Sequence, residues 1–232
     1  MIALVLFALV GAPPPGFVDL KATVPGIALD IRYHTASNFS GAPLPGYATP
    51  AAWMLEEPAR ALARVQAELN KQGLGLIVYD AYRPLRATLA MVAWAERTQQ
   101  VKLLDDGYIA RRSGHNHGHT IDLGAIDLKT QQPLDMGTAW DTLSEESHTM
   151  RANGEALEHR LLLKKAMEAQ GFKPYLKEWW HFSYPAKGTR PRDVPYGCAE
   201  PKEGAWQPPK GWNEAGFQMP ASAPVQACED RR

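Results

Sequence analysis

The chain has few cysteines, no excess of charge of either sign and no long hydrophobic run. Two cysteines in 232 residues are too few for a disulfide scaffold, so the fold must rest on a packed core. Lys plus Arg and Asp plus Glu both number 25. Without a basic excess we expect no nucleic-acid partner. The apolar run at residues 2–10 is much shorter than the roughly 20 residues of a membrane-spanning helix, so we expect no stable span.

The N-terminal segment has two interpretations. The apolar run is followed by Gly11 and Ala12, an order typical of a secretory signal peptide. No basic residue precedes the run, and three prolines follow at positions 13–15, which favours the alternative of a buried N-terminal strand. We expect residues 1–16 to be a signal peptide or an N-terminal apolar segment. A signal peptide predicts a periplasmic or secreted protein, and a cytoplasmic location is the alternative.

The C-terminal tail, residues 188–232, is rich in proline and cannot hold long regular elements. Both cysteines, Cys198 and Cys228, lie in it. A Cys198–Cys228 disulfide would tie the tail down, contribute roughly 3–4 kcal/mol and persist only in an oxidising compartment. Two unrelated free thiols are the alternative.

Between these ends, residues 17–187 carry mixed helical and strand patterns without repeats. Residues 37–50 are typical of a loop. Apolar patterning predicts strands near residues 28–33, 74–80, 119–127 and 178–184. It predicts three helices: one with Pro58 in its first turn and Leu62, Val65 and Leu69 on one face, ended by Gly73; one opened by Pro84; and one over 155–170 with Leu157 and Leu161 stacked, stopped by Gly171. This is a single α+β domain.

Three segments carry residues suited to metal-assisted hydrolysis. They are residues 80–84, 113–122 and 178–181. Catalytic zinc needs three protein ligands and an open position, which His115, Asp122 and His181 could supply. Glu178 could act as a base beside the bound water, and Arg83 could face the oxygen that gains charge. Together they form a complete set for a metallohydrolase.

The spacing of these residues sets conditions on the local structure. His115 and Asp122 are seven residues apart, which on a flat strand would point them to opposite faces. A turn at Gly118 must therefore intervene, with His115 on a loop and Asp122 on the following strand. Glu178 and His181 are three apart, which puts them on one face of a helix, or requires a bulge or bend in a strand.

Other interpretations of the same residues stay open. His115, His117 and His119 alternate and could form a tri-histidine site on a regular strand, although Gly118 argues against one. His117 and His119 are otherwise expected beside the ligands or facing solvent. Arg83 could instead pair with a core carboxylate and Glu178 could lie on a surface strand. The remaining residues are expected in structural roles: His34, His148 and His159 at the surface or hydrogen-bonded, and Trp179 and Trp180 in the core.

At these residues the sequence resembles the zinc D-alanyl-D-alanine dipeptidases, the vancomycin-resistance type within the larger group of zinc D,D-peptidases. That family carries Ser-x-His-x-x-Gly-x-x-x-Asp and Glu-x-x-His segments, which occur here at residues 113–122 and 178–181. The Asp-x-Tyr-Arg-Pro segment at 80–84 is also a family feature, and residues 33–41 and 136–148 look similar. The resemblance covers roughly residues 29–184.

The resemblance implies a role for each matched position. His115, Asp122 and His181 would bind Zn²⁺, Glu178 would be the general base and then the acid, and Arg83 would stabilise the tetrahedral intermediate. The residues that would hold the dipeptide are Tyr33, Ser113 and Asp141, with Asp141 facing its free ammonium group. The implied fold is a compact D,D-peptidase/hedgehog-like domain with helices around an antiparallel sheet.

The implied activity is hydrolysis of D-Ala-D-Ala or a close D,D-dipeptide, a small-molecule substrate. A zinc D,D-carboxypeptidase or peptidoglycan endopeptidase and a non-catalytic zinc-stabilised cell-wall-binding module are the alternatives. The sequence departs from the family pattern at Thr120, where a small residue such as Ala is usual, and at His117 and His119. These departures bear on the shape of the pocket. The sequence leaves the oligomeric state open.

Overall fold

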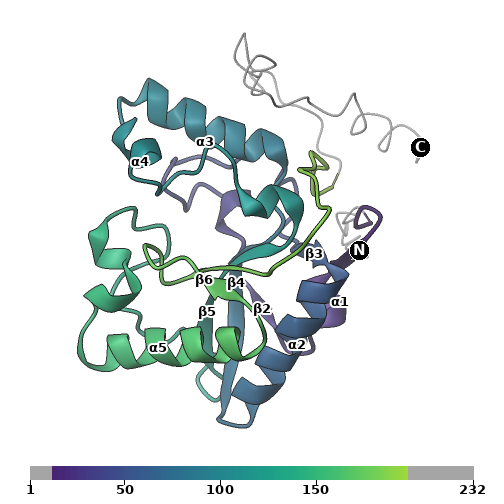
Figure 1. Ribbon diagram of the computed structural model, residues 1–232, viewed down its shortest axis with the longest axis vertical. Coiled ribbons are helices and arrows are strands. Elements are labelled where there is room, and N and C mark those ends of the chain that lie inside the picture. The colour runs from purple at the N-terminus through teal and green to yellow at the C-terminus, as the bar shows by residue number, and fades with distance from the viewer. Residues whose placement is uncertain (1–11, 198–232) are drawn as a thin grey trace, which may run out of the picture.

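The computed structural model describes residues 12–197. The apolar run at 2–10 and both cysteines lie outside these residues, so the signal-peptide and disulfide predictions stay predictions. Within them the chain forms one α+β domain built on a five-stranded sheet, with a separate two-stranded ribbon (Figure 1). The sheet has the order β2-β4-β5-β7-β6, with bounds β2 Ala28–Leu29, β4 Leu74–Asp80, β5 Thr120–Asp127, β7 His181–Ser183 and β6 Lys173–Pro174.

The sheet is mixed, whereas the sequence resemblance implied an antiparallel one. β4, β5, β7 and β6 pair antiparallel, but β2 pairs parallel with β4 at the edge. The expected strand at 28–33 is also shorter than predicted, because a 3₁₀ helix, η1 (Arg32–His34), follows the two residues of β2. Parallel pairing is possible here because the chain crosses over through the ribbon and a helix before it enters β4.

The central strands β4 and β5 carry apolar side chains on both faces. Seven of the eight residues of β5 are buried, as expected for a strand covered on both sides. The long segments 74–80 and 119–127 were predicted as strands, and both predictions are confirmed. The ribbon pairs β1 (Phe17–Asp19) antiparallel with β3 (Trp53–Leu55).

Two predicted helices form with the expected ends. α2 (Glu56–Asn70) has Pro58 in its first turn, where a missing N–H breaks no helical bond, and ends shortly before Gly73, whose φ is +74°. Its expected apolar face is buried. α3 (Leu85–Arg97) follows Pro84. In Figure 1, α3 and the short α4 (Lys102–Asp105) lie at one end of the molecule, and α2 and the third helix, α5, lie at the other.

The third helix forms, but its core face differs from the prediction. α5 (Gly154–Ala169) buries Arg160, Leu163 and Met167, whereas Leu161 is 38% exposed. The buried Arg160 side chain donates hydrogen bonds to the backbone oxygens of Met136, Glu146 and His148, which ties the loop at 136–148 to the helix. The remaining short helices are α1 Leu20–Thr23, η2 Gly114–His117, η3 Glu145–Ser147 and η4 Thr149–Arg151.

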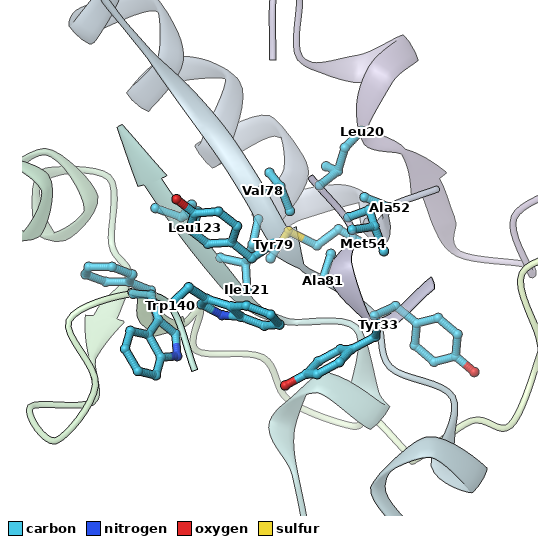
Figure 2. Packing of buried hydrophobic residues seen from close by; sticks show 14 of the residues in the cluster. Leu20, Tyr33, Ala52, Met54, Val78, Tyr79, Ala81, Ile121, Leu123 and Trp140 are labelled. Carbon is cyan, nitrogen blue, oxygen red and sulfur yellow. The ribbon is translucent and has the colours of Figure 1, made fainter. Parts of the chain in front are cut away.

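The hydrophobic core is shared by the ribbon, the sheet and the helices around them. Figure 2 shows Leu20, Met54, Val78 and Leu123 packed together in this cluster. No helix among residues 12–197 is long and apolar enough to cross a membrane.

The beginning of the expected tail packs onto the domain. We call residues 192–196 the C-terminal strap. Leu85 N donates to Arg192 O at 3.0 Å, and Arg86 pairs with Asp193 at 3.0 Å. Tyr196 is fully buried, and its hydroxyl donates to Tyr82 O at 2.6 Å. The strap therefore fastens the turn between β4 and α3.

Candidate metal centre and substrate pocket

Strand register brings three polar side chains into one row across the sheet. Asp122 on β5 lies opposite Asp80 on β4 and opposite His181 on β7. Directly opposed residues on neighbouring strands share a face, so their side chains converge. The β4–β5 register shifts between Val78 and Asp80, a bulge that brings Asp80 opposite Asp122.

His115 reaches the same place from a turn, as its spacing from Asp122 required. Ser113 caps η2 by accepting a hydrogen bond from His115 N at 3.3 Å, and Gly118 closes the turn with φ +77°. His115 Nδ1 lies 2.6 Å from the backbone oxygen of Ala81. A carbonyl oxygen only accepts, so Nδ1 carries the proton and Nε2 presents a lone pair.

Three donor atoms meet at this point. Asp122 Oδ1 lies 3.2 Å from His115 Nε2 and 3.0 Å from His181 Nδ1, and the two nitrogens are 3.4 Å apart. Asp122 Oδ1 is buried and accepts no hydrogen bond from any residue in the range 12–197. Three donor atoms this close together, one of them a carboxylate oxygen without a hydrogen bond, fit a cation, and two imidazoles with one carboxylate are a zinc-type set. The residues present therefore fit the metal that the sequence pattern predicted.

The charge states of two of these side chains suit ligation. Burial opposes ionisation of Asp122, but His115 and His181 together hold its pKa below the usual range. Burial lowers the pKa of His181, which keeps its imidazole neutral. A metal ligand must be a deprotonated carboxylate or a neutral imidazole. His181 is the most exposed of the three, with 21% of its side chain accessible, so the site opens on that side.

Glu178 lies beside the metal ligands because of a turn. His181 N donates to Glu178 O at 3.2 Å, so residues 178–181 form a turn that leads into β7. The strand expected at 178–184 is therefore shorter, and the bend that the three-residue spacing required comes from this turn. The carboxylate of Glu178 lies 3.5 Å from His181 Nδ1. Burial raises its pKa well above the usual range, and the charges of Asp122 and Asp141 add to the rise.

Arg83 is held by a buried carboxylate. Its Nε and Nη2 each lie 2.9 Å from Asp80 Oδ2, and Nη2 lies 3.7 Å from Asp122. Asp80 Oδ1 in turn accepts a 2.5 Å hydrogen bond from Tyr47. Burial favours the neutral form of Arg83, but Asp80 overrides it and raises the pKa above its usual range. The guanidinium therefore stays charged. Arg83 both pairs with a core carboxylate, which was the alternative interpretation, and lines the site.

Tyr33 and Asp141 form a second polar group in the pocket. The Tyr33 hydroxyl donates to Asp141 Oδ1 at 3.1 Å. Asp141 Oδ2 is buried and has no hydrogen-bond partner among the described residues. Burial raises the pKa of Asp141 to about 8, with a further contribution from the charge of Asp122. Asp141 also has φ +66°, a left-handed conformation that Asp tolerates better than most residues. A buried oxygen without a donor is a ready acceptor for a positively charged group.

One pocket of about 320 Å³ contains all eight site residues named from the sequence. They come from η1, the β4–α3 turn, η2 and its N-cap, β5, the loop at 136–148, the turn before β7 and the first residue of β7. Sequence reasoning assigned no role in the pocket to other side chains that line it, because local patterns do not show which side chains face a cavity: Phe39, Met91, Tyr108, Ile109, Arg112, Leu143, Tyr175 and Trp180. Asp80 was part of a quoted motif, but its hold on Arg83 needed the structure.

The other histidines lie outside the group of three. His117 Nδ1 lies 3.0 Å from Thr189 Oγ1, and the rings of His117 and His119 are 5.5 Å apart. A tri-histidine site is therefore wrong, since the turn at Gly118 breaks the strand between them. The three remaining histidines are hydrogen-bonded, His34 to Tyr47 O, His148 to the Tyr108 hydroxyl and His159 to Asp135 O.

Comparisons with known proteins agree with this geometry. A family model described as D-ala-D-ala dipeptidase matches residues 14–198. A D-alanyl-D-alanine dipeptidase of Enterococcus faecalis is 34% identical over 72% of this chain and 90% of its own length. A D-alanyl-D-alanine dipeptidase of Enterococcus faecium is 32% identical over 78% of this chain and 94% of its own length. One of Escherichia coli is 31% identical over 75% of this chain and 87% of its own length. The chain belongs to the Peptidase M15 family of D-ala-D-ala dipeptidases.

Proposed function

We propose that this protein is a zinc-dependent dipeptidase that hydrolyses D-Ala-D-Ala, or a closely related D,D-dipeptide, to free D-amino acids. The proposal rests on the membership of the family and on one observation. A three-ligand metal group, a buried carboxylate beside it, a charged arginine and a second buried carboxylate with an unpartnered oxygen all line the same small pocket.

His115, Asp122 and His181 would hold the zinc ion. Zinc in a three-ligand site acts as a Lewis acid towards a carbonyl group and lowers the pKa of water. Glu178 is the general base that takes a proton from the attacking water and returns it to the leaving amine. A carboxylate with a raised pKa suits both transfers near neutral pH.

Arg83 stabilises the negative charge that develops on the carbonyl oxygen during attack. It is suited to this because Asp80 fixes its guanidinium before substrate arrives, so little reorganisation is needed in the reaction. Asp80 and Tyr47 act through Arg83 and are positioning residues.

Asp141 and Tyr33 select a substrate with a free amino group. The unpartnered Asp141 Oδ2 would accept from the ammonium of a dipeptide, a charge-assisted contact that an acylated nitrogen cannot make. This feature favours a dipeptidase over the alternative of a carboxypeptidase or endopeptidase. A non-catalytic zinc module would use neither Glu178 nor Arg83.

The proposal is tested by measuring release of D-alanine from D-Ala-D-Ala by the zinc-loaded protein, with L-Ala-L-Ala and N-acetyl-D-Ala-D-Ala as controls. Hydrolysis of the free D,D-dipeptide alone supports the assignment. Preferred cleavage of the acetylated substrate would instead identify a carboxypeptidase, and binding of zinc without cleavage of any substrate would favour the non-catalytic module.

A further inference from the structure

A second pocket lies beside the substrate pocket. It has a volume of about 370 Å³ and is lined by Arg32, Tyr79, Trp140, Trp179 and residues 133–139. We call it the outer pocket. None of the eight site residues lines it, and nothing in the proposed reaction uses it.

Residues that are neighbours in the sequence line the two different pockets. Trp140 lines the outer pocket, and the next residue, Asp141, lines the substrate pocket. Trp179 likewise lines the outer pocket, and the next residue, Trp180, lines the substrate pocket. The rings of the two tryptophans meet edge to face with their centroids 5.2 Å apart. Neighbouring residues thus face opposite sides of a shared partition.

Trp140 is the central member of this partition. Its ring lies 4.9 Å from that of Tyr33, which lines the substrate pocket, and is stacked at 5.5 Å on that of Tyr79, which lines the outer pocket. Figure 2 shows Trp140 with Tyr79 on one side and Tyr33 on the other. All three rings are buried. The single indole of Trp140 therefore lies between the two cavities at this point.

The partition stands at the end of the substrate pocket where the ammonium group would bind. Tyr33 contacts Trp140 through its ring and donates to Asp141 through its hydroxyl at 3.1 Å. A group attached to the substrate nitrogen would have to pass Asp141 and Tyr33 and would meet the indole of Trp140. Trp140 Nε1 is buried without a hydrogen-bond partner among the described residues, so the contribution of this side chain here is its bulk.

We propose that Trp140 is a specificity-determining residue that closes the amino-terminal end of the substrate pocket, and that the outer pocket is the space an N-terminal extension would enter if the indole were absent. The inference rests on the proposed function and deepens it. Asp141 selects the charge of a free amine, and Trp140 independently excludes the volume of a blocked one.

The test compares kcat/KM for N-acetyl-D-Ala-D-Ala with that for D-Ala-D-Ala in zinc-loaded Trp140→Ala and Trp140→Leu. Opening the partition should raise the ratio of the two values by at least about tenfold, the scale on which pocket volume discriminates. Trp140→Phe keeps a ring and should change the ratio by less than about threefold. Trp53→Leu is the matched control, since Trp53 is equally buried but packs on Tyr82 and Tyr196 and lines neither pocket.

Binding gives a second readout that does not depend on turnover. In zinc-loaded Glu178→Gln protein, calorimetry should show tighter binding of the acetylated dipeptide when Trp140 is also replaced by Leu. A Trp140→Leu enzyme that hydrolyses the free dipeptide with an unchanged ratio and unchanged binding would overturn the inference. Failure of the wild-type protein to cleave either substrate would instead count against the proposed function, and binding would then decide the role of Trp140.

Discussion

His115 Nδ1 lies 2.6 Å from the backbone oxygen of Ala81, at the end of β4. Two residues later the same segment carries Arg83, and the residue before Ala81 is Asp80, which holds Arg83 in place. One strand end therefore sets the tautomer of a metal ligand and the position of the charged arginine. The distance between the metal group and the oxyanion donor is fixed by a rigid element, which is what catalysis by preorganised charges needs.

Replacing Glu178 with Gln should separate metal binding from catalysis. Glu178 is not one of the three converging ligands, so the variant should keep one zinc per chain, measured by elemental analysis. It should lose the proton transfers, which contribute about 10² to 10⁴ in rate, so kcat should fall by that factor. Asp122→Asn is the contrasting variant, because it removes a ligand and should lose zinc. A Glu178→Gln protein with near-normal kcat would refute the assignment of the base.

Asp141 should make the stability of the metal-free protein depend on pH. Its folded pKa of about 8 lies above that of an unfolded Asp, about 3.9. Between these values the folded state binds the extra proton, so this group's contribution to stability is full below about pH 4 and is lost as pH rises towards 8. The slope is at most about 1.4 kcal/mol per pH unit. Asp141→Asn should lack this pH-dependent contribution to the free energy of unfolding in urea. The stability of the variant relative to wild type should therefore increase with pH. A difference that does not vary between pH 4 and 8 would contradict the raised pKa.

Truncations should show that the C-terminal strap belongs to the functional domain. A chain ending at 197 keeps the buried Tyr196 and the Arg86–Asp193 pair, and should retain stability and kcat. A chain ending at 187 loses both, and removal of a fully buried aromatic side chain alone costs about 3–5 kcal/mol. It should also lose kcat, because the strap holds Leu85 next to the Arg83 turn. Equal melting temperatures for the two truncations would rule out this role.

We propose that the protein is exported, on the basis of the apolar run at residues 2–10 and the cysteine pair in the tail. Fractionation of expressing cells should find it outside the cytoplasm with a shortened N-terminus, and thiol labelling should find Cys198 and Cys228 protected until a reductant is added. A cytoplasmic protein with an intact N-terminus and reactive thiols would exclude export.

The sequence predicted the strands and the turn that follow strong local patterns. The apolar segment at 74–80 and the Gly118 turn between His115 and Asp122 both form as expected. Local patterns do not report which strands pair or which helix face meets the core, so the parallel pairing of β2 and the buried face of α5 were missed. The spacing of Leu161 predicted a core residue. Arg160 is buried instead, because its side chain donates a hydrogen bond to the backbone oxygen of Met136, which is far away in the sequence.

The pocket walls were the least predictable part of the site for a related reason. Trp140 and Tyr79 are far apart in sequence, and their stacked rings meet only in the folded chain. Trp140 lies in the segment 136–148 that resembles the family, but the sequence alone indicated no role for it in the pocket.

The catalytic role of the metal is tested by a metal cycle on one preparation of the purified protein, with D-alanine release from D-Ala-D-Ala as the readout. We predict hydrolysis by the zinc-loaded protein, loss of activity after chelation and recovery when one zinc ion per chain is restored. Hydrolysis that survives removal of the metal, with the protein shown to be zinc-free, would contradict the assignment of His115, Asp122 and His181 as the catalytic centre.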